Sequence, residues 1–199
     1  MPPPRPASDV LAGIFWMLVT TLLFVSVTAI VRFLGTDIPA PEAAFIRYAI
    51  GLVMIAPWLL PALRNPPKGR RFGLYAARGM AHGVAVMLWF FAMARIPVAE
   101  VTAIGYTAPI FVTVGAALFL GERMHIRRVA AVLVAFVGAF VILRPGFQEL
   151  NIGQLAQLGA APLFACSFLL AKKMTDDEDP NVIVGWLSLF CTLDRKSVV

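Results

Sequence analysis

Apolar runs of about 20 residues recur along this chain with almost no charged residue inside them. A run of that length crosses a bilayer as an α-helix, because a helix rises about 1.5 Å per residue and satisfies its own backbone hydrogen bonds. Only 14% of the 199 residues are charged, against roughly 25% in soluble domains. We therefore predict an all-α fold, a polytopic transmembrane helix bundle.

Six runs are long enough to cross, and short connections rich in proline, glycine and charge separate them. The predicted spans are residues 10–34, 43–63, 72–94, 98–120, 126–143 and 153–171. A seventh run, residues 182–193, holds only 12 residues and is too short to cross. Residues 1–9 contain four prolines and are predicted to form a disordered tail. The abrupt polar change after residue 193 leads us to expect a non-native or interrupted end at residues 194–199.

The basic residues divide unequally between the two sides of the predicted bundle. Ten lie on the side that holds the N-terminus: Arg5, Arg64, Lys68, Arg70, Arg71, Arg123, Arg127, Arg128, Lys172 and Lys173. The opposite side carries Arg32, Arg95 and Arg144. Because basic loops stay in the cytoplasm, we predict a multi-pass membrane protein with a cytoplasmic N-terminus. This distribution leaves no basic patch for nucleic acid, despite a net charge of +6.

The sequence also contains a weak internal repeat. Shifting it by 140 residues places Gly13 on Gly153 and Phe24 on Phe164. The shift crosses five predicted spans, and an odd number of spans inverts the second copy in the membrane. Inverted repeats are typical of secondary transporters, which hold substrate near the midplane between two halves.

Four short motifs carry a resemblance to a known family. They comprise Phe45, Ile46, Arg47 and Tyr48 in the second predicted span, Ala94, Arg95, Ile96, Pro97, Val98, Ala99 and Glu100 at the start of the fourth, Pro109, Ile110 and Phe111 within it, and Gly121, Glu122 and Arg123 at its end. On these residues the chain resembles the drug/metabolite transporter (DMT) superfamily, of the EamA type, over residues 11–193.

The resemblance implies a bacterial inner-membrane protein with ten helices in two five-helix inverted repeats. On this interpretation, residues 10–144 form a complete first repeat of five transmembrane helices. Residues 153–193 begin the second repeat, with one full helix and part of the next, and we expect the second repeat to be interrupted there.

One face of the third predicted span carries Arg78, His82 and Trp89, at spacings of four and seven residues. Arg78 and His82 lie near the predicted midplane, where a lipid-facing arginine costs about 2.5 to 3.5 kcal/mol on insertion scales. We therefore expect this face to point into the bundle and contact an anionic or zwitterionic substrate. The alternative is that Arg78 extends toward the cytoplasmic headgroups and His82 only bonds a neighbouring helix.

Two further charged residues, Arg47 and Glu100, enter the second and fourth spans from the outer side at similar depth. We expect them to form a pair that binds substrate or gates access, with Glu100 or His82 as an acceptor for a coupling proton. The alternative is a structural ion pair or a solvated residue at the helix entrance.

Pro109 is the middle residue of the fourth predicted span. Because proline has no N–H, the carbonyl of Gly105 loses its helical partner and the helix should weaken there. Opened backbone at membrane depth usually lines a cavity, so Pro109 and Tyr106 are predicted site residues. A packed kink without a ligand is the alternative.

The leading hypothesis is a secondary transporter that moves a small polar metabolite, such as an amino acid or a carboxylate, by alternating access. Its expected partners are the lipid bilayer, the small-molecule substrate and a coupling proton. One alternative is a half-transporter or inactive fragment that needs a partner, such as a homodimer if the chain is naturally this short. Another is a membrane-embedded enzyme acting on lipid-linked substrates. We predict no catalytic residue, cofactor or metal, because Cys166 and Cys191 lack ligand spacing and the acidic run 176–179 has no second cluster.

Overall fold

The computed structural model describes residues 7–34, 37–64, 66–67, 69–121, 126–143, 151–175 and 178–193. In these residues the chain forms helices and contains no strand, which confirms the predicted all-α fold. The helices are α1 (Ala7–Leu34), α2 (Ala40–Arg64), α3 (Arg70–Arg95), α4 (Val98–Gly105), α5 (Ala108–Leu120), α6 (Ile126–Leu143), α7 (Ile152–Met174) and α8 (Pro180–Leu193).

Five stretches of the described residues are long and apolar enough to cross a membrane, by length and composition. They are Leu11–Phe33, Ala40–Arg64, Arg70–Arg95, Val98–Leu120 and Ile152–Met174. Helices α6 and α8 carry the shorter apolar stretches Val129–Gly138 and Pro180–Thr192. The chain is therefore a multi-pass membrane protein, and the boundaries of its long helices follow those predicted from the sequence.

The predicted tail and the predicted chain end fall largely outside the described residues. Helix α1 begins at Ala7, three residues before the predicted start, so Ser8 and Asp9 lie in its first turn. Residues 1–6, 122–125, 144–150, 176–177 and 194–199 lie outside the described part of the chain.

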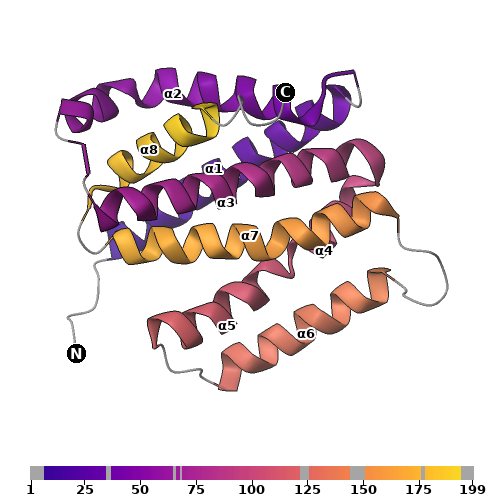
Figure 1. Ribbon diagram of the computed structural model, residues 1–199. Helices are drawn as coiled ribbons and strands as arrows, with labels where there is room; N and C mark the ends of the chain where they lie inside the picture. Colours follow the sequence, from indigo (N-terminus) through magenta and orange to yellow (C-terminus); the bar gives the residue numbers. More distant parts are fainter. Residues whose placement is uncertain are drawn as a thin grey trace.

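Helix α3 occupies the centre of the bundle (Figure 1). It packs against α7 on one side and against α8 and α2 on the other, while α5 and α6 lie beyond α7. Helix α1 crosses behind α3. In its apolar stretch Leu11–Phe33, 0% of the residues of the most apolar part are buried against the rest of the described chain. Such apolar exposure is expected of a helix whose solvent is lipid or a neighbouring helix.

Small residues allow the central helices to approach closely. Ala85 and Ala92 of α3 and Ala160 of α7 are fully buried. Lipid is as apolar as leucine, so helix association in a membrane depends on close van der Waals contact, which small side chains permit.

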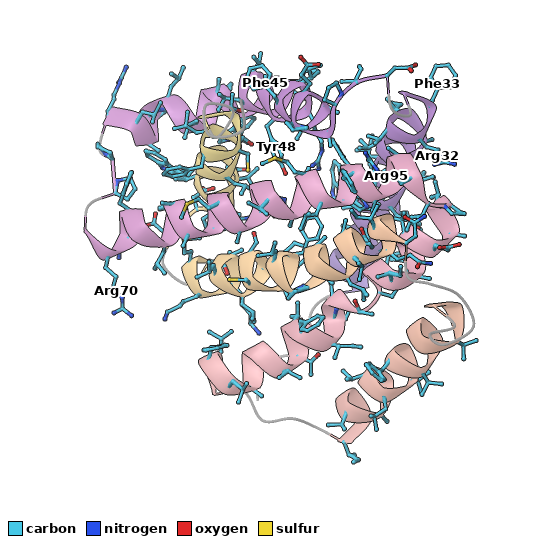
Figure 2. All side chains as sticks on the ribbon, turned by 45° about the vertical axis from the view of Figure 1, so that its right-hand side comes forward. Arg32, Phe33, Phe45, Tyr48, Arg70 and Arg95 are labelled. Atoms are coloured by element: carbon cyan, nitrogen blue, oxygen red, sulfur yellow. The ribbon has the colours of Figure 1, made fainter. Side chains whose placement is uncertain are left out.

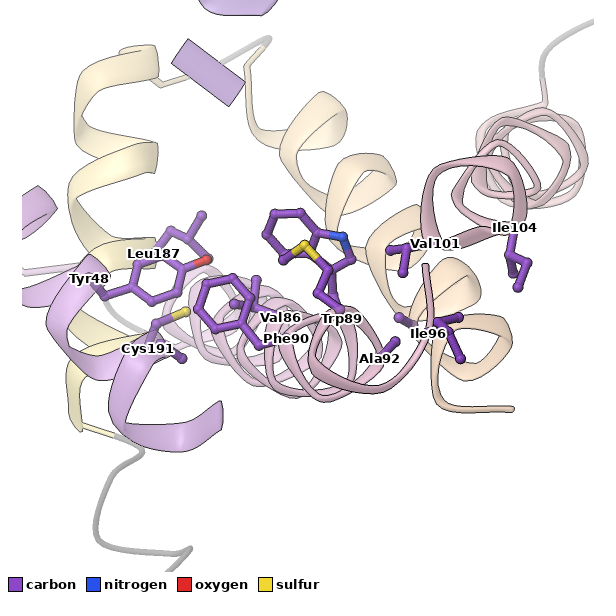
Figure 3. Close-up of a cluster of buried hydrophobic side chains, with 13 residues drawn as sticks. Tyr48, Val86, Trp89, Phe90, Ala92, Ile96, Val101, Ile104, Leu187 and Cys191 are labelled. Atoms are coloured by element: carbon purple, nitrogen blue, oxygen red, sulfur yellow. The ribbon is translucent and has the colours of Figure 1, made fainter. Parts of the chain in front are cut away.

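Large side chains add to this packing and form the larger of two buried hydrophobic clusters in the described residues. Figure 3 shows Trp89 and Phe90 of α3 between Tyr48 and Leu187 on one side and Val101 of α4 on the other. This core joins α2, α3, α4, α7 and α8, and it fixes the walls of the cavity described next.

Candidate functional site

A cavity of about 500 Å³ lies between α1, α2, α3, α4, α5 and α7. Its lining is mostly aromatic and aliphatic, with a few polar groups, as is usual for sites that bind small organic molecules. The lining residues are Phe24, Thr28, Arg47, His82, Val86, Trp89, Val101, Thr102, Gly105, Tyr106, Ala108, Pro109, Gln157, Phe164 and Phe168. Five predicted site residues are therefore brought together here: Arg47, His82, Trp89, Tyr106 and Pro109.

Aromatic rings form much of the cavity wall. Trp89 stacks on Phe24 of α1, with ring centroids 5.4 Å apart and an interplanar angle of 16°. On α7, Phe164 and Phe168 stack at 6.2 Å, and the His82 ring meets Phe164 edge-on at 5.3 Å. An aromatic lining of this kind can contact a planar ligand ring in offset-stacked or edge-on geometry.

The helix break predicted at Pro109 is confirmed. Helix α4 ends at Gly105, Tyr106 and Thr107 form a turn, and α5 begins at Ala108 with Pro109 in its first turn. The hydroxyl of Thr107 donates a hydrogen bond to the carbonyl of Ile104 at 2.6 Å and stabilises the turn. Thr107 is buried, and Gly105, Tyr106 and Pro109 line the cavity, which is where opened backbone is tolerated within a membrane.

The polar groups of two predicted site residues already have partners. Nδ1 of His82 lies 3.0 Å from the hydroxyl oxygen of Ser167 on α7. Nη1 of Arg47 donates to the hydroxyl of Tyr48 at 3.2 Å, and the guanidinium lies over the Tyr48 ring at 5.1 Å from its centroid. These contacts orient both side chains at the edge of the cavity.

Arg78 lies outside the cavity, which corrects the prediction of one wall shared with His82 and Trp89. Its side chain is buried, and Nη1 donates to the carbonyl of Ile183 on α8 at 2.8 Å. The helix spacing placed Arg78 on an inward face correctly. However, this face contacts α8 rather than the cavity. The carbonyl of Ile183 on α8 accepts one hydrogen bond from the buried guanidinium.

Glu100 also lies outside the cavity, and its predicted pair with Arg47 is not formed. Its Oε2 accepts a hydrogen bond from Nε2 of Gln154 at 2.9 Å. Oε1 of Gln154 in turn accepts a hydrogen bond from the backbone N–H of Asn151 at the start of α7. The carboxylate therefore fastens the first turn of α7 to α4, while Arg47 turns toward Tyr48.

Among the cavity residues that were not identified from the sequence, Gln157 of α7 carries a buried polar side chain. Its side chain is only 3% exposed, and within the described part of the chain its Oε1 has no hydrogen-bond partner. The signal that could have found it is the pair Gln154 and Gln157, two amides three residues apart in an otherwise apolar predicted span.

Comparison with known proteins finds one matching family and several curated relatives. The EamA-like transporter family matches residues 11–144. The chain is 31% identical over 186 residues to a riboflavin transporter of Vibrio cholerae, covering 92% of this chain and 62% of that protein. It is 26% identical over 166 residues to an S-adenosylmethionine uptake transporter of Rickettsia bellii, covering 83% and 57%.

A third relative is the pseudopaline exporter of Pseudomonas aeruginosa, 30% identical over 184 residues, covering 92% of this chain and 64% of that protein. The chain thus spans about three fifths of the length of the curated relatives it matches. No solved structure matches it.

Proposed function

Because this chain belongs to the EamA-like transporter family, of the DMT type, we propose that it contributes the substrate cavity of a membrane transporter working by alternating access. The observation that carries the proposal is the cavity of about 500 Å³, which is lined by helices on several sides at the break between α4 and α5. Family membership and these relatives point to transport rather than to enzymatic chemistry.

The lining supports a flat, partly apolar solute more than a free amino acid or carboxylate. Of the two arginines expected to bind an anion, Arg78 bonds α8 and Arg47 is engaged with Tyr48. Aromatic side chains, among them those of Trp89 and Phe164, form much of the remaining cavity lining. We therefore propose a ring-bearing metabolite, and riboflavin is the first compound to test, because relatives are named as its transporters.

The proposed orientation places the N-terminus in the cytoplasm of a bacterium and the chain in its inner membrane. Figure 2 supports it, because Arg70 lies at one end of the bundle and Arg32 and Arg95 lie at the other. At that second end, Arg32 donates to the carbonyl of Met93 at 2.8 Å, so its charge is partly satisfied within the chain. The end with Arg70 also carries Arg71, Lys172 and Lys173 near the ends of their helices, as positive-inside topology requires.

Uptake by proteoliposomes tests the proposal directly. The protein is expressed from the complete gene that encodes this chain, purified and reconstituted, and entry of radiolabelled riboflavin is followed against empty liposomes. We expect saturable, time-dependent uptake that unlabelled riboflavin suppresses. Uptake of a free carboxylate or amino acid in place of riboflavin would contradict the proposed ring-bearing substrate, and uptake of no tested solute would contradict transport.

Replacing Pro109 with alanine is expected to slow transport about tenfold without loss of stability. Alanine restores an N–H that can bond the carbonyl of Gly105, so α4 and α5 can join and move Gly105 and Tyr106, which line the cavity. Initial rates in proteoliposomes measure the effect at matched protein levels.

Pro162→Ala provides the matched control. Pro162 lies inside α7, is exposed and does not line the cavity, so its replacement should change the transport rate far less. Equal rates for Pro109→Ala and the unmodified protein would show that the break between α4 and α5 has no role in transport.

A further inference from the structure

We infer that Gln157 recognises the transported solute by hydrogen bonding to a ring amide or imide edge, an inference that rests on the proposed transport function. Gln157 lines the cavity from α7 and is 3% exposed, and none of the residues that the structure describes forms a hydrogen bond with its Oε1. An amide carbonyl withdrawn from water and left unpaired destabilises a protein, so a buried group of this kind usually has a partner.

The neighbouring polar side chains do not provide that partner. His82 bonds Ser167, Arg47 bonds Tyr48, and the hydroxyl of Thr102 donates to the carbonyl of Val98 at 2.8 Å. Gln154, one turn earlier on α7, bonds Glu100 and the backbone of Asn151. Of these two glutamines, Gln157 is therefore the one whose carbonyl is left for a ligand.

Gly105, the last residue of α4 at the break, leaves space for this amide. A Cβ added at Gly105 would lie 3.2 Å from Nε2 of Gln157, tighter than ordinary van der Waals contact, so glycine leaves the space that the amide group occupies. Rotation about the last side-chain bond exchanges Oε1 and Nε2, because a primary amide carries an acceptor and a donor at similar positions. Either group can thus be presented to the cavity.

The chemistry of the occupant follows from the two kinds of surface that meet here. Trp89, Phe164 and Phe168 offer aromatic faces, and Gln157 offers one acceptor and one donor side by side. A flat nitrogen heterocycle with an N–H next to a C=O complements both, in the way that Asn and Gln bond the adjacent donor and acceptor of a nucleobase. The inferred substrate class is therefore a planar heterocycle with an amide or imide edge.

The test compares riboflavin with its N3-methyl derivative, in which a methyl group replaces the imide hydrogen. Binding of each compound to the purified full-length protein is measured by equilibrium dialysis, and uptake of each is measured in proteoliposomes. The unmodified protein should bind riboflavin at least about tenfold more tightly than the methyl derivative, the factor expected for one buried hydrogen bond.

Gln157→Leu should remove this preference, by weakening riboflavin binding about tenfold while leaving the methyl derivative nearly unchanged. Gln157→Met, which keeps an unbranched side chain, serves if the leucine variant fails to fold. Gln154→Leu is the matched control: it removes a glutamine amide from the same helix outside the cavity and should keep the ratio of the two affinities.

Each outcome separates this inference from the proposed function. Equal binding of both compounds by the unmodified protein, or an equal loss of both in Gln157→Leu, overturns the role of Gln157, while saturable uptake would leave the transport function standing. Binding of neither compound also overturns the inferred class. If the protein binds riboflavin more tightly than the methyl derivative, loses this preference in Gln157→Leu and takes up neither compound, the result supports recognition by Gln157 and overturns the transport function.

Discussion

Gly79→Ala is expected to destabilise the protein by about 1–3 kcal/mol, because a single added methyl group overfills the contact between α3 and α8. A Cβ at Gly79 would overlap the Cβ of Phe190. Since Phe190 Cβ is fixed to the α8 backbone, rotation of the phenyl ring cannot relieve the overlap, and the two helices must separate. Their separation would disturb the buried bond from Arg78 to Ile183 as well.

Thermal unfolding of the protein in detergent measures this effect. Unfolding is followed on heating as the loss of the monodisperse size-exclusion peak. Gly73→Ala is the matched control, because Gly73 lies on the same helix and a Cβ there meets nothing within 4 Å. That variant should be unchanged or more stable by about 0.5–1 kcal/mol, since alanine costs less backbone entropy in a helix than glycine. Equal melting temperatures for Gly79→Ala and the unmodified protein would contradict the close packing of α3 on α8.

Trp89→Ala is expected to abolish measurable transport. Trp89 is 6% exposed, stacks on Phe24 and contacts Phe90, so its removal takes away both a cavity wall and part of the core. Core substitutions of tryptophan by alanine cost about 3–5 kcal/mol, and the loss of a stacking face weakens ligand binding further. Affinity for riboflavin should fall at least about 100-fold, the factor that corresponds to roughly 2.7 kcal/mol.

Two other variants separate the loss of the wall from general damage. Trp89→Phe keeps an aromatic face and should retain part of the affinity. Trp58→Ala removes a tryptophan that is 52% exposed on α2 and does not line the cavity, so its binding should stay within a factor of about two. Equal affinities for Trp89→Ala and Trp58→Ala, both folded, would show that the Trp89 ring does not contact the solute.

Much of the helix arrangement along the chain could be predicted because a membrane imposes strict local rules. The length of the apolar runs was enough to predict where the long helices lie along the sequence, and the missing N–H of Pro109 predicted the break between α4 and α5. Gly121, in the resemblance motif at the end of the fourth predicted span, ends α5 in the left-handed conformation with φ 65°, a common way for helices to stop. These properties depend on each segment and its solvent, so no knowledge of neighbouring helices was needed.

The side-chain partners could not be predicted in the same way. Helical spacing predicted Arg78, His82 and Trp89 on one inward face. In the structure Arg78 bonds the backbone of α8, whereas His82 and Trp89 line the cavity. Arg47 and Glu100 have similar predicted depths, and each bonds a different neighbour. Periodicity fixes where a residue points on its own helix, but it contains no information about which helix stands opposite.

The sequence by itself thus determined that the chain is a helical membrane protein, where its long helices run and where one of them breaks. Only the tertiary structure decided which inward-facing residues share a cavity, and it added Gln157, whose buried Oε1 has no partner among the described residues. The physical reason is that hydrophobic length and backbone hydrogen bonding act within one segment, whereas a binding site forms from side chains that meet when distant segments pack.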